Sequence, residues 1–243
     1  MRPELLSSFN IPVSEGTLLK RYQRFLTDVN VPSLALPLTV HCPNTGSMMG
    51  LDTPGSRVLI SYSGNEKRKY PYTLECVKSG RSWVCVNTLR ANQLAGMMLE
   101  QHMIAGLGGY ARIEPEPRYR KDTRFDFFLR PNGSGGMGAY VEVKSVTLAL
   151  GGGLAGFPDS VTERGRKHLR MLMSATAEGF QAVLLFICFR SDCGKVAAAA
   201  HIDPEYASLL EMAWKKGVRV LAIKVRVTKR GFWKPDGLMK VEL

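Results

Sequence analysis

The chain has 243 residues, enough for one large domain or two modest domains with hydrophobic cores. Hydrophobic residues make up 45% and charged residues 22% of the sequence, which places it in the ordinary soluble globular class and excludes a disordered or collagen-like chain. With 33 basic against 21 acidic residues, the net charge of +12 favours polyanionic partners such as nucleic acid, although such an excess can also serve solubility alone.

Neither a leader nor a membrane segment is expected. The N-terminal stretch MRPELLSSF has no apolar core of a signal peptide, and the longest apolar run, residues 182–189, is too short to span a bilayer. The 5 cysteines are an odd number without a CxxC pair, so we expect reduced core thiols rather than a zinc site. We therefore expect a cytoplasmic protein with no membrane partner.

Residues 1–86 have the pattern of a β domain. Clusters of Pro, Asn, Gly and Ser separate five candidate strands, which we place at residues 16–31, 37–42, 57–63, 72–78 and 82–87. Short strands at this spacing predict a small barrel, and the five-stranded OB type is the leading fold. We therefore predict that residues 1–86 form an OB-like barrel that binds nucleic acid.

Basic and aromatic residues are interleaved twice in this barrel, as KRYQRF at 20–25 and KRKYPY at 67–72. Cationic side chains contact phosphates and aromatic rings can stack on bases, whereas the alternative is a solvated strand face above core aromatics. The repeated cluster favours DNA contact, with Lys20, Arg21, Arg24, Lys67, Arg68 and Lys69 as candidates. The loop HCPNTGSMM, residues 41–49, either presents N–H groups to a phosphate or is a turn packed for its own sake.

From residue 87 to 243 the pattern changes to alternating helices and strands. We expect a helix from 88 to about 106, hairpin strands at 124–130 and 139–148, a flexible glycine bridge at 151–156, a helix capped by Ser160 or Thr162 and ending near 179, a buried strand at 183–189, a helix from 204 to 217, a strand at 218–227 and a basic aromatic tail at 229–234. This order predicts a mixed α/β sheet with helices on its faces.

The hairpin carries the candidate chemistry. Glu142 and Lys144 are two residues apart in the second strand and so point to one face, and hairpin pairing can place Asp126 beside them. Two carboxylates and a lysine suit Mg²⁺ or Mn²⁺ together with a phosphate. The alternative is a solvated face with a weak ion pair. Glu100, the only acid of the first helix, is either exposed or joins this cluster.

The helix that begins near residue 162 has a charged flank formed by Glu163, Arg166, Lys167 and Arg170. It is either a solvated, internally paired flank or a surface that faces phosphate. Glu163, in the first turn, is a further candidate for the acidic site. His201 is expected to be a structural or capping histidine rather than a ligand.

Segments spread over nearly the whole chain resemble the sugar fermentation stimulation protein A family: GTLLKRYQRFLTDV, HCPNTGSM, RFDFFL, VEVKSVTLA, FPDSVTERGRKHL and HIDPEYASLL. The resemblance implies an OB-like domain followed by a PD-(D/E)xK nuclease-like α/β domain, DNA binding and a link to sugar metabolism. The nuclease pattern corresponds to Asp126, Glu142 and Lys144, with Glu100 as the acid of the first helix and Glu163 in a site-lining segment. Phe125 stands where proline often precedes the first acid, which removes no ligand.

Two functions of different classes follow. The first, which we take as the primary function, is a DNA-binding protein that contacts the backbone of double-stranded DNA non-specifically and has a regulatory role in sugar metabolism. The second is an active Mg²⁺- or Mn²⁺-dependent DNA phosphodiesterase, in which Asp126 and Glu142 hold the metal, Glu100 or Glu163 assists, and Lys144 positions the attacking water. The sequence leaves a homodimer open, and recognition of a phosphorylated sugar has no sequence feature of its own.

Overall fold

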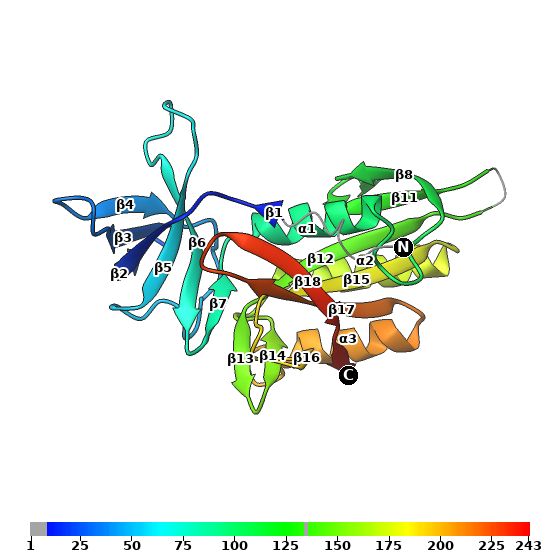
Figure 1. Ribbon diagram of the computed structural model, residues 1–243. Helices are drawn as coiled ribbons and strands as arrows, with labels where there is room; N and C mark the ends of the chain where they lie inside the picture. The colour runs from blue at the N-terminus through cyan, green and yellow to red at the C-terminus, as the bar shows by residue number, and fades with distance from the viewer. Residues whose placement is uncertain (1–8, 134–135) are drawn as a thin grey trace.

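The structure is a computed structural model that describes residues 9–133 and 136–243. Within these residues the chain forms a β-barrel, an α/β part and three helices, which are α1 (Leu89–Glu100), α2 (Glu163–Ala177) and α3 (Pro204–Lys215). The barrel lies to the left in Figure 1 and the α/β part to the right. In the described part of the chain, no helix is long and apolar enough to cross a membrane.

The barrel consists of β2 (Ser14–Tyr22), β3 (Leu26–Asn30), β4 (Leu38–His41), β5 (Arg57–Tyr62) and β6 (Tyr72–Ser79), with β7 (Ser82–Cys85) beside β6. Pairing of β4 with β6 closes the ring and confirms the predicted five-stranded barrel. Its membership differs from the prediction. The run 16–31 is two strands, because Gln23 and Arg24 adopt φ of 51° and 63° and turn the chain, and β7 lies outside the ring.

The α/β part is built on a seven-stranded sheet within the described residues. Its order is β1 (Phe9–Asn10), β18 (Phe232–Leu238), β17 (Arg219–Val227), β15 (Gln181–Cys188), β12 (Ala139–Val146), β11 (Phe127–Pro131) and β8 (Tyr110–Pro115). The central strands β12, β15 and β17 are parallel, and β15 is buried on both faces as its apolar run predicts. The mixed α/β fold is therefore confirmed, although β1, which was expected in the barrel domain, pairs with β18.

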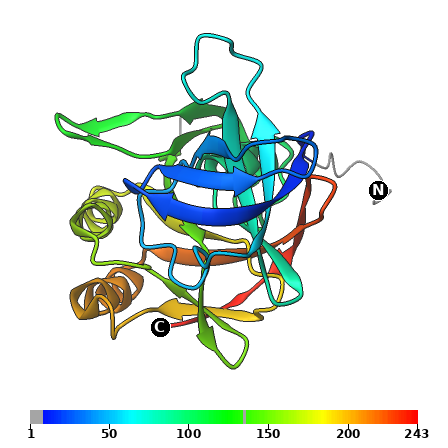
Figure 2. The ribbon, with the colours of Figure 1, turned by 90° about the vertical axis from the view of Figure 1, so that its left-hand side faces the viewer.

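The helices cover opposite faces of this sheet. From α1, Leu94 packs in the same core as Val143 and Val225, whereas Leu169 of α2 and Leu210 of α3 pack against the other face. Figure 2 shows α2 and α3 side by side. In α2, Thr162 is the N-cap and accepts a hydrogen bond of 3.0 Å from the Gly165 N–H, as one of the two predicted caps.

Two small sheets complete the described part of the chain: β9 (Arg118–Arg120) with β10 (Thr123–Arg124), and β13 (Leu148–Gly151), β14 (Leu154–Phe157), β16 (Lys195–Ala198) and β19 (Lys240–Glu242). Their positions show that two predicted boundaries were wrong. The glycine bridge 151–156 is a hairpin, with φ of 93°, 58° and 76° at residues 151–153 forming its turn. The first hairpin strand begins at Phe127, because Thr123 and Arg124 pair with β9 instead.

Two further boundaries differ. The first helix ends at Glu100 rather than near residue 106, because the backbone angles of its C-cap residue, Gln101, are no longer helical. The predicted tail 229–234 is not a tail, because β18 runs antiparallel to β17 and buries Trp233 completely. All five cysteines are free and buried, as expected of core thiols.

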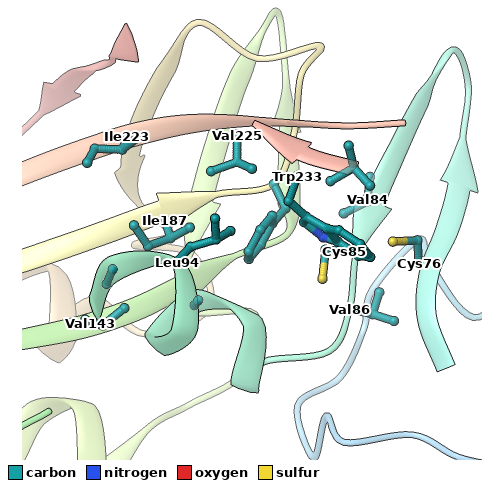
Figure 3. Close-up of a cluster of buried hydrophobic side chains, with 14 of the residues drawn as sticks. Cys76, Val84, Cys85, Val86, Leu94, Val143, Ile187, Ile223, Val225 and Trp233 are labelled. Carbon is teal, nitrogen blue, oxygen red and sulfur yellow. The ribbon is translucent and has the colours of Figure 1, made fainter. Parts of the chain in front are cut away.

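One hydrophobic core joins the barrel to the α/β part. Figure 3 shows Cys76, Val84 and Val86 from the barrel beside Trp233, with Leu94 of α1 nearby. The completely buried Glu75 of β6 adds a polar link between the two parts. Its carboxylate accepts hydrogen bonds from Ser61, Asn87 and Arg90, and the Arg90 Nε lies 2.9 Å from Glu75 Oε2. The start of α1 is therefore held firmly against the barrel.

Candidate functional site

A cleft of about 750 Å³ lies between the barrel loop 43–46 and the α/β part. The barrel contributes Arg24 and Asn44 to its wall, and α1 contributes Asn92. The segment just before β11 contributes Asp126, β12 contributes Glu142 and Lys144, and α2 contributes Arg164. The three predicted residues Asp126, Glu142 and Lys144, called the acid–lysine cluster below, therefore open into one shared space.

The barrel loop is a packed rim of this cleft. The Arg21 guanidinium donates to the carbonyl oxygens of Asn44 and Gly46, each at 2.9 Å, and the Met48 N–H donates to Asp159 Oδ2 at 3.0 Å. A Cβ at Gly46 would lie 2.7 Å from the Asp159 carboxylate oxygens, so a larger residue there would displace that carboxylate. These contacts favour the alternative in which the loop is a packed turn, because the Met48 N–H already has an acceptor in Asp159 of the α/β part.

Asp126 directly precedes β11, at the open end of the β11–β12 hairpin. Phe127 pairs with Val141 in the antiparallel register, so Asp126 lies across from Glu142. The Val143 N–H donates to Asp126 Oδ2 at 2.7 Å, and Asn92 Nδ2 donates to Oδ1 at 2.6 Å. Burial, and then the charge of Glu142, raise the pKa of Asp126 above its ordinary value in spite of these hydrogen bonds.

Glu142 is 2% exposed and holds the centre of the cluster. Its Oε1 accepts a hydrogen bond from the Lys144 ammonium and contacts His168 Nδ1 from α2. Burial alone would raise the pKa of Glu142, but the Lys144 charge and the His168 hydrogen bond outweigh it and hold the pKa below its ordinary value. The other oxygen, Oε2, is buried and has no hydrogen-bond partner among the described residues.

This donor set fits a hard divalent cation. Mg²⁺ keeps several waters and is commonly held by one or two carboxylates, so Asp126 and Glu142 suffice. The partnerless Glu142 Oε2 is an acceptor that a cation would satisfy, and buried polar atoms seldom lack a partner. The described residues contain no group of three or more His, Cys, Asp and Glu side chains that could hold a metal by themselves.

The structure does not bring Glu100 or Glu163 to the cluster. Glu100 is exposed at the end of α1, about 12 Å along the helix axis from the site-facing Asn92. The Glu163 side chain is 90% exposed and lies 3.7 Å from Arg166 rather than beside Glu142. The polar helix side chains that line the cleft are those of Asn92 and Arg164.

The predicted DNA contacts divide into two groups. Arg166 and Arg170 pair with acids of α3 and its N-cap, Lys167 pairs with Asp122, and Arg21 serves the rim of the cleft. The others remain on the barrel surface: Lys20, Arg24, Lys67 and Lys69 are exposed, and Arg68 donates to Thr73 Oγ1 at 3.3 Å. Lys20 lies 5.0 Å from the Tyr22 ring centroid and Lys69 lies 5.4 Å from that of Tyr70.

Three residues of the site were missed in the sequence. His168 is four residues before Leu172 and therefore lies on the buried stripe of α2, where a polar side chain signals a buried partner. Asn92 is on the exposed side of the predicted α1, and no local pattern connects it with Asp126. Arg164 is adjacent in sequence to the charged flank of α2, and the direction of its side chain depends on how α2 packs on the sheet.

Comparisons with known proteins agree with this architecture. Residues 19–86 match the model of the SfsA N-terminal OB domain, and residues 89–231 match that of the Sugar fermentation stimulation protein RE domain. The chain is also similar to a solved structure described as Pyrococcus furiosus SfsA in complex with Ca²⁺. The TM-score is 0.88 at 24% identity, with 97% of this chain and 98% of that chain covered, so the likeness concerns the fold.

Proposed function

The chain belongs to the sugar fermentation stimulation protein family, and from this premise we propose that it binds DNA in the cleft and hydrolyses a phosphodiester there with a divalent cation. The observation that carries the proposal is the convergence of Asp126, Glu142 and Lys144 in one cleft, with Glu142 Oε2 left without a hydrogen-bond partner among the described residues. Carboxylates and an ammonium side by side suit a cation and a phosphate together.

Mg²⁺ or Mn²⁺ is the expected cation. The Pyrococcus furiosus relative is described in complex with Ca²⁺, which also prefers oxygen ligands. When bound, such a cation supplies positive charge to a phosphate and makes a water more acidic. Asp126 and Glu142 would hold it, while the Asn92 amide and the Val143 N–H keep the Asp126 carboxylate in its orientation.

Lys144 and His168 have complementary roles in this proposal. Both contact Oε1 of Glu142, so they leave Oε2 for the cation and fix the orientation of the carboxylate. The Lys144 side chain is 13% exposed and lines the cleft, so its ammonium can turn to a phosphate oxygen and balance charge that develops during hydrolysis.

The charge of the chain supports DNA as the polyanion. Arg24 from the barrel and Arg164 from α2 both line the cleft and are exposed, so they can contact phosphates on its two sides. Lys20, Lys67 and Lys69 extend the basic surface over the barrel. In this proposal the protein binds duplex DNA through non-specific contacts with the backbone. Its role is in the regulation of sugar metabolism.

The test is a digestion assay with single- and double-stranded DNA, in Mg²⁺ or Mn²⁺ against EDTA. We expect cation-dependent cleavage that falls at least about a thousandfold in Glu142→Gln, Asp126→Asn and Lys144→Ala. Glu163→Gln is the matched control, because it makes the same chemical change in the exposed acid outside the cluster, and it should cleave as the wild type does.

A second candidate is DNA binding without hydrolysis. It is favoured by one observation: the Lys144 ammonium is engaged by Glu142 and lies 3.2 Å from His168 Nδ1, an arrangement that a purely structural ion pair would also have. Salt-sensitive DNA binding in all four variants, with no cleavage by any protein, would establish this candidate and reject the hydrolysis. Absence of DNA binding by the wild type would reject both.

A further inference from the structure

A second cavity, of about 530 Å³, lies next to the cleft and has not been assigned a role. Five cationic side chains line it, from the β9–β10 hairpin and from α2: Arg118, Lys121, Arg124, Arg164 and Lys167. We call these residues the basic pocket. One acid, Asp122, lines the same cavity, so the positive charge is far from balanced within it.

Most of this charge has no internal partner. Lys167 pairs with Asp122, and Arg124 lies 3.8 Å from the largely exposed Glu116. Arg118, Lys121 and Arg164 are exposed and form no ion pair with an acid in the described part of the chain. Unpaired cations that converge in a concave surface repel one another, and an anion relieves that repulsion.

The pocket is held in shape by the protein. The Tyr119 ring packs against Phe125 and Tyr140, with centroid distances of 5.2 and 5.1 Å, and its hydroxyl donates to Glu178 Oε1 at 3.0 Å. At the base of the hairpin, the Phe125 N–H donates to the Pro117 carbonyl at 3.2 Å. The cations of β9 and β10 therefore stand on a hairpin that is anchored to the sheet and to the end of α2.

The basic pocket and the acid–lysine cluster lie on two sides of the same short segments. Arg124 faces the pocket while Asp126, two residues later, faces the cleft. On α2, Arg164 lines both cavities. His168 borders the basic pocket and contacts Glu142. An anion in the pocket would therefore be a close neighbour of a phosphate at the cluster.

We propose that the basic pocket binds a backbone phosphate of the same DNA strand that passes the acid–lysine cluster, with Arg164 contacting the strand between the two positions. The inference rests on the proposed function. Phosphate oxygens match guanidinium and ammonium donors in charge and geometry, and contacts of this kind position a strand without reading its bases. The pocket is thus a positioning subsite, which sets where the strand lies relative to the cluster.

The test uses the double variant Arg118→Ala/Lys121→Ala, since both side chains are exposed and unpaired and their removal leaves the hairpin anchors intact. The matched control is Arg81→Ala/Lys216→Ala, which removes the same charges from exposed positions outside both cavities. DNA binding is measured in EDTA over a range of salt concentrations. The pocket variant should bind about tenfold more weakly, and the slope of log affinity against log salt should fall by about 2.

A second readout locates the phosphate. Uncharged methylphosphonate linkages, placed one at a time along the DNA, should weaken wild-type binding at a defined linkage. The same linkage should have no further effect in the pocket variant, because the partner cations are already gone. The control variant should respond as the wild type does.

Three outcomes would overturn the inference. If the pocket variant binds DNA as the control does, the subsite is wrong while the proposed function stands. If the wild type binds no DNA, the proposed function fails and the subsite fails with it. If calorimetry with inorganic phosphate or a hexose phosphate shows binding that the pocket variant loses, while DNA binding is unchanged, the pocket serves a free phosphorylated ligand instead.

Discussion

The two flanks of α2 carry similar basic residues and have different fates. On the outer flank, Arg166 and Arg170 face α3, whose start provides Asp203 and Glu205 as partners. On the inner flank, Arg164 and Lys167 face the β9–β10 hairpin, where Lys167 pairs with Asp122 but Arg164 forms no ion pair with an acid in the described part of the chain. Basic residues on a helix thus become structural or remain available according to the element packed opposite them.

Replacement of His168, which lies on the inner flank of α2 and contacts Glu142, should have the largest effect. His168→Leu removes the contact with Glu142 Oε1, so cation affinity should fall by about 10- to 100-fold. His168→Asn keeps a hydrogen-bonding group and should recover most of the loss. Cation titrations of DNA cleavage, with kcat separated from the half-saturating cation concentration, check this. Equal behaviour of the two variants would show that His168 only fills space.

On the outer flank we expect a loss of stability rather than of function. Asp203 is completely buried, caps α3 through the Tyr206 N–H at 2.8 Å, and holds Arg166. Asp203→Ala should lower the free energy of unfolding by about 3 kcal/mol, because a cap and a buried ion-pair partner are both removed. DNA affinity should stay within about twofold of the wild type. Urea denaturation measures the free energy of unfolding, and DNA titration measures the affinity. If both fell together in Asp203→Ala, the two flanks would not differ in function.

The same aspartate predicts a pH dependence. Burial raises the pKa of Asp203, but hydrogen bonds from Arg166 and from the Thr162 and Tyr206 N–H groups outweigh it and hold the pKa below the ordinary value. Its contribution is therefore complete above the unfolded-state pKa of about 3.9 and is lost as the pH falls through the lower folded-state pKa. The stability difference between wild type and Asp203→Asn should shrink below about pH 4. A constant difference across this range would contradict the assignment.

Single replacements of Arg164 on the inner flank and Arg170 on the outer flank test the comparison further. Arg164→Ala removes an exposed cation at the junction of the cleft and the basic pocket, and DNA affinity should fall about tenfold. Its salt slope should fall by about 1. Fluorescence anisotropy with labelled duplex over a range of salt concentrations measures both quantities, and an unchanged slope would remove Arg164 from the DNA surface.

The smallest effect is expected for Arg170→Ala. Its ion pair with Glu205 is about half exposed on both sides, and such pairs contribute little. Both the midpoint of thermal unfolding and DNA affinity should be nearly unchanged. A clear loss of DNA affinity would return the outer flank to the DNA surface and reverse the comparison.

Local patterns predicted most of the fold. Alternation and turn residues gave the barrel, the continuous apolar run gave β15, and the cap at Thr162 gave the start of α2. The errors came where the backbone bends sharply or where partners are distant. Gln23 and Arg24 turn the chain with positive φ although neither is glycine, and Trp233 became a core residue because β17 accepts β18.

The site was predictable only in part. Asp126, Glu142 and Lys144 share a hairpin, so strand geometry alone brings them together. Their neighbours Asn92 and His168 come from two helices on opposite faces of the sheet, and no local spacing encodes such a meeting. The position of Glu163 illustrates the reverse error, because a family segment indicates that a region lines a site but not which way each side chain points.

Trp233 has a consequence for how the molecule melts. It lies in the α/β part of the chain, yet it is buried in one core with Cys76 and Val84 of the barrel (Figure 3). Domains that share a core do not unfold independently, because neither can unfold without exposing the apolar surface of the other. Calorimetry should therefore show a single cooperative transition, and the barrel should have remained with this α/β partner through evolution rather than moving as an independent module.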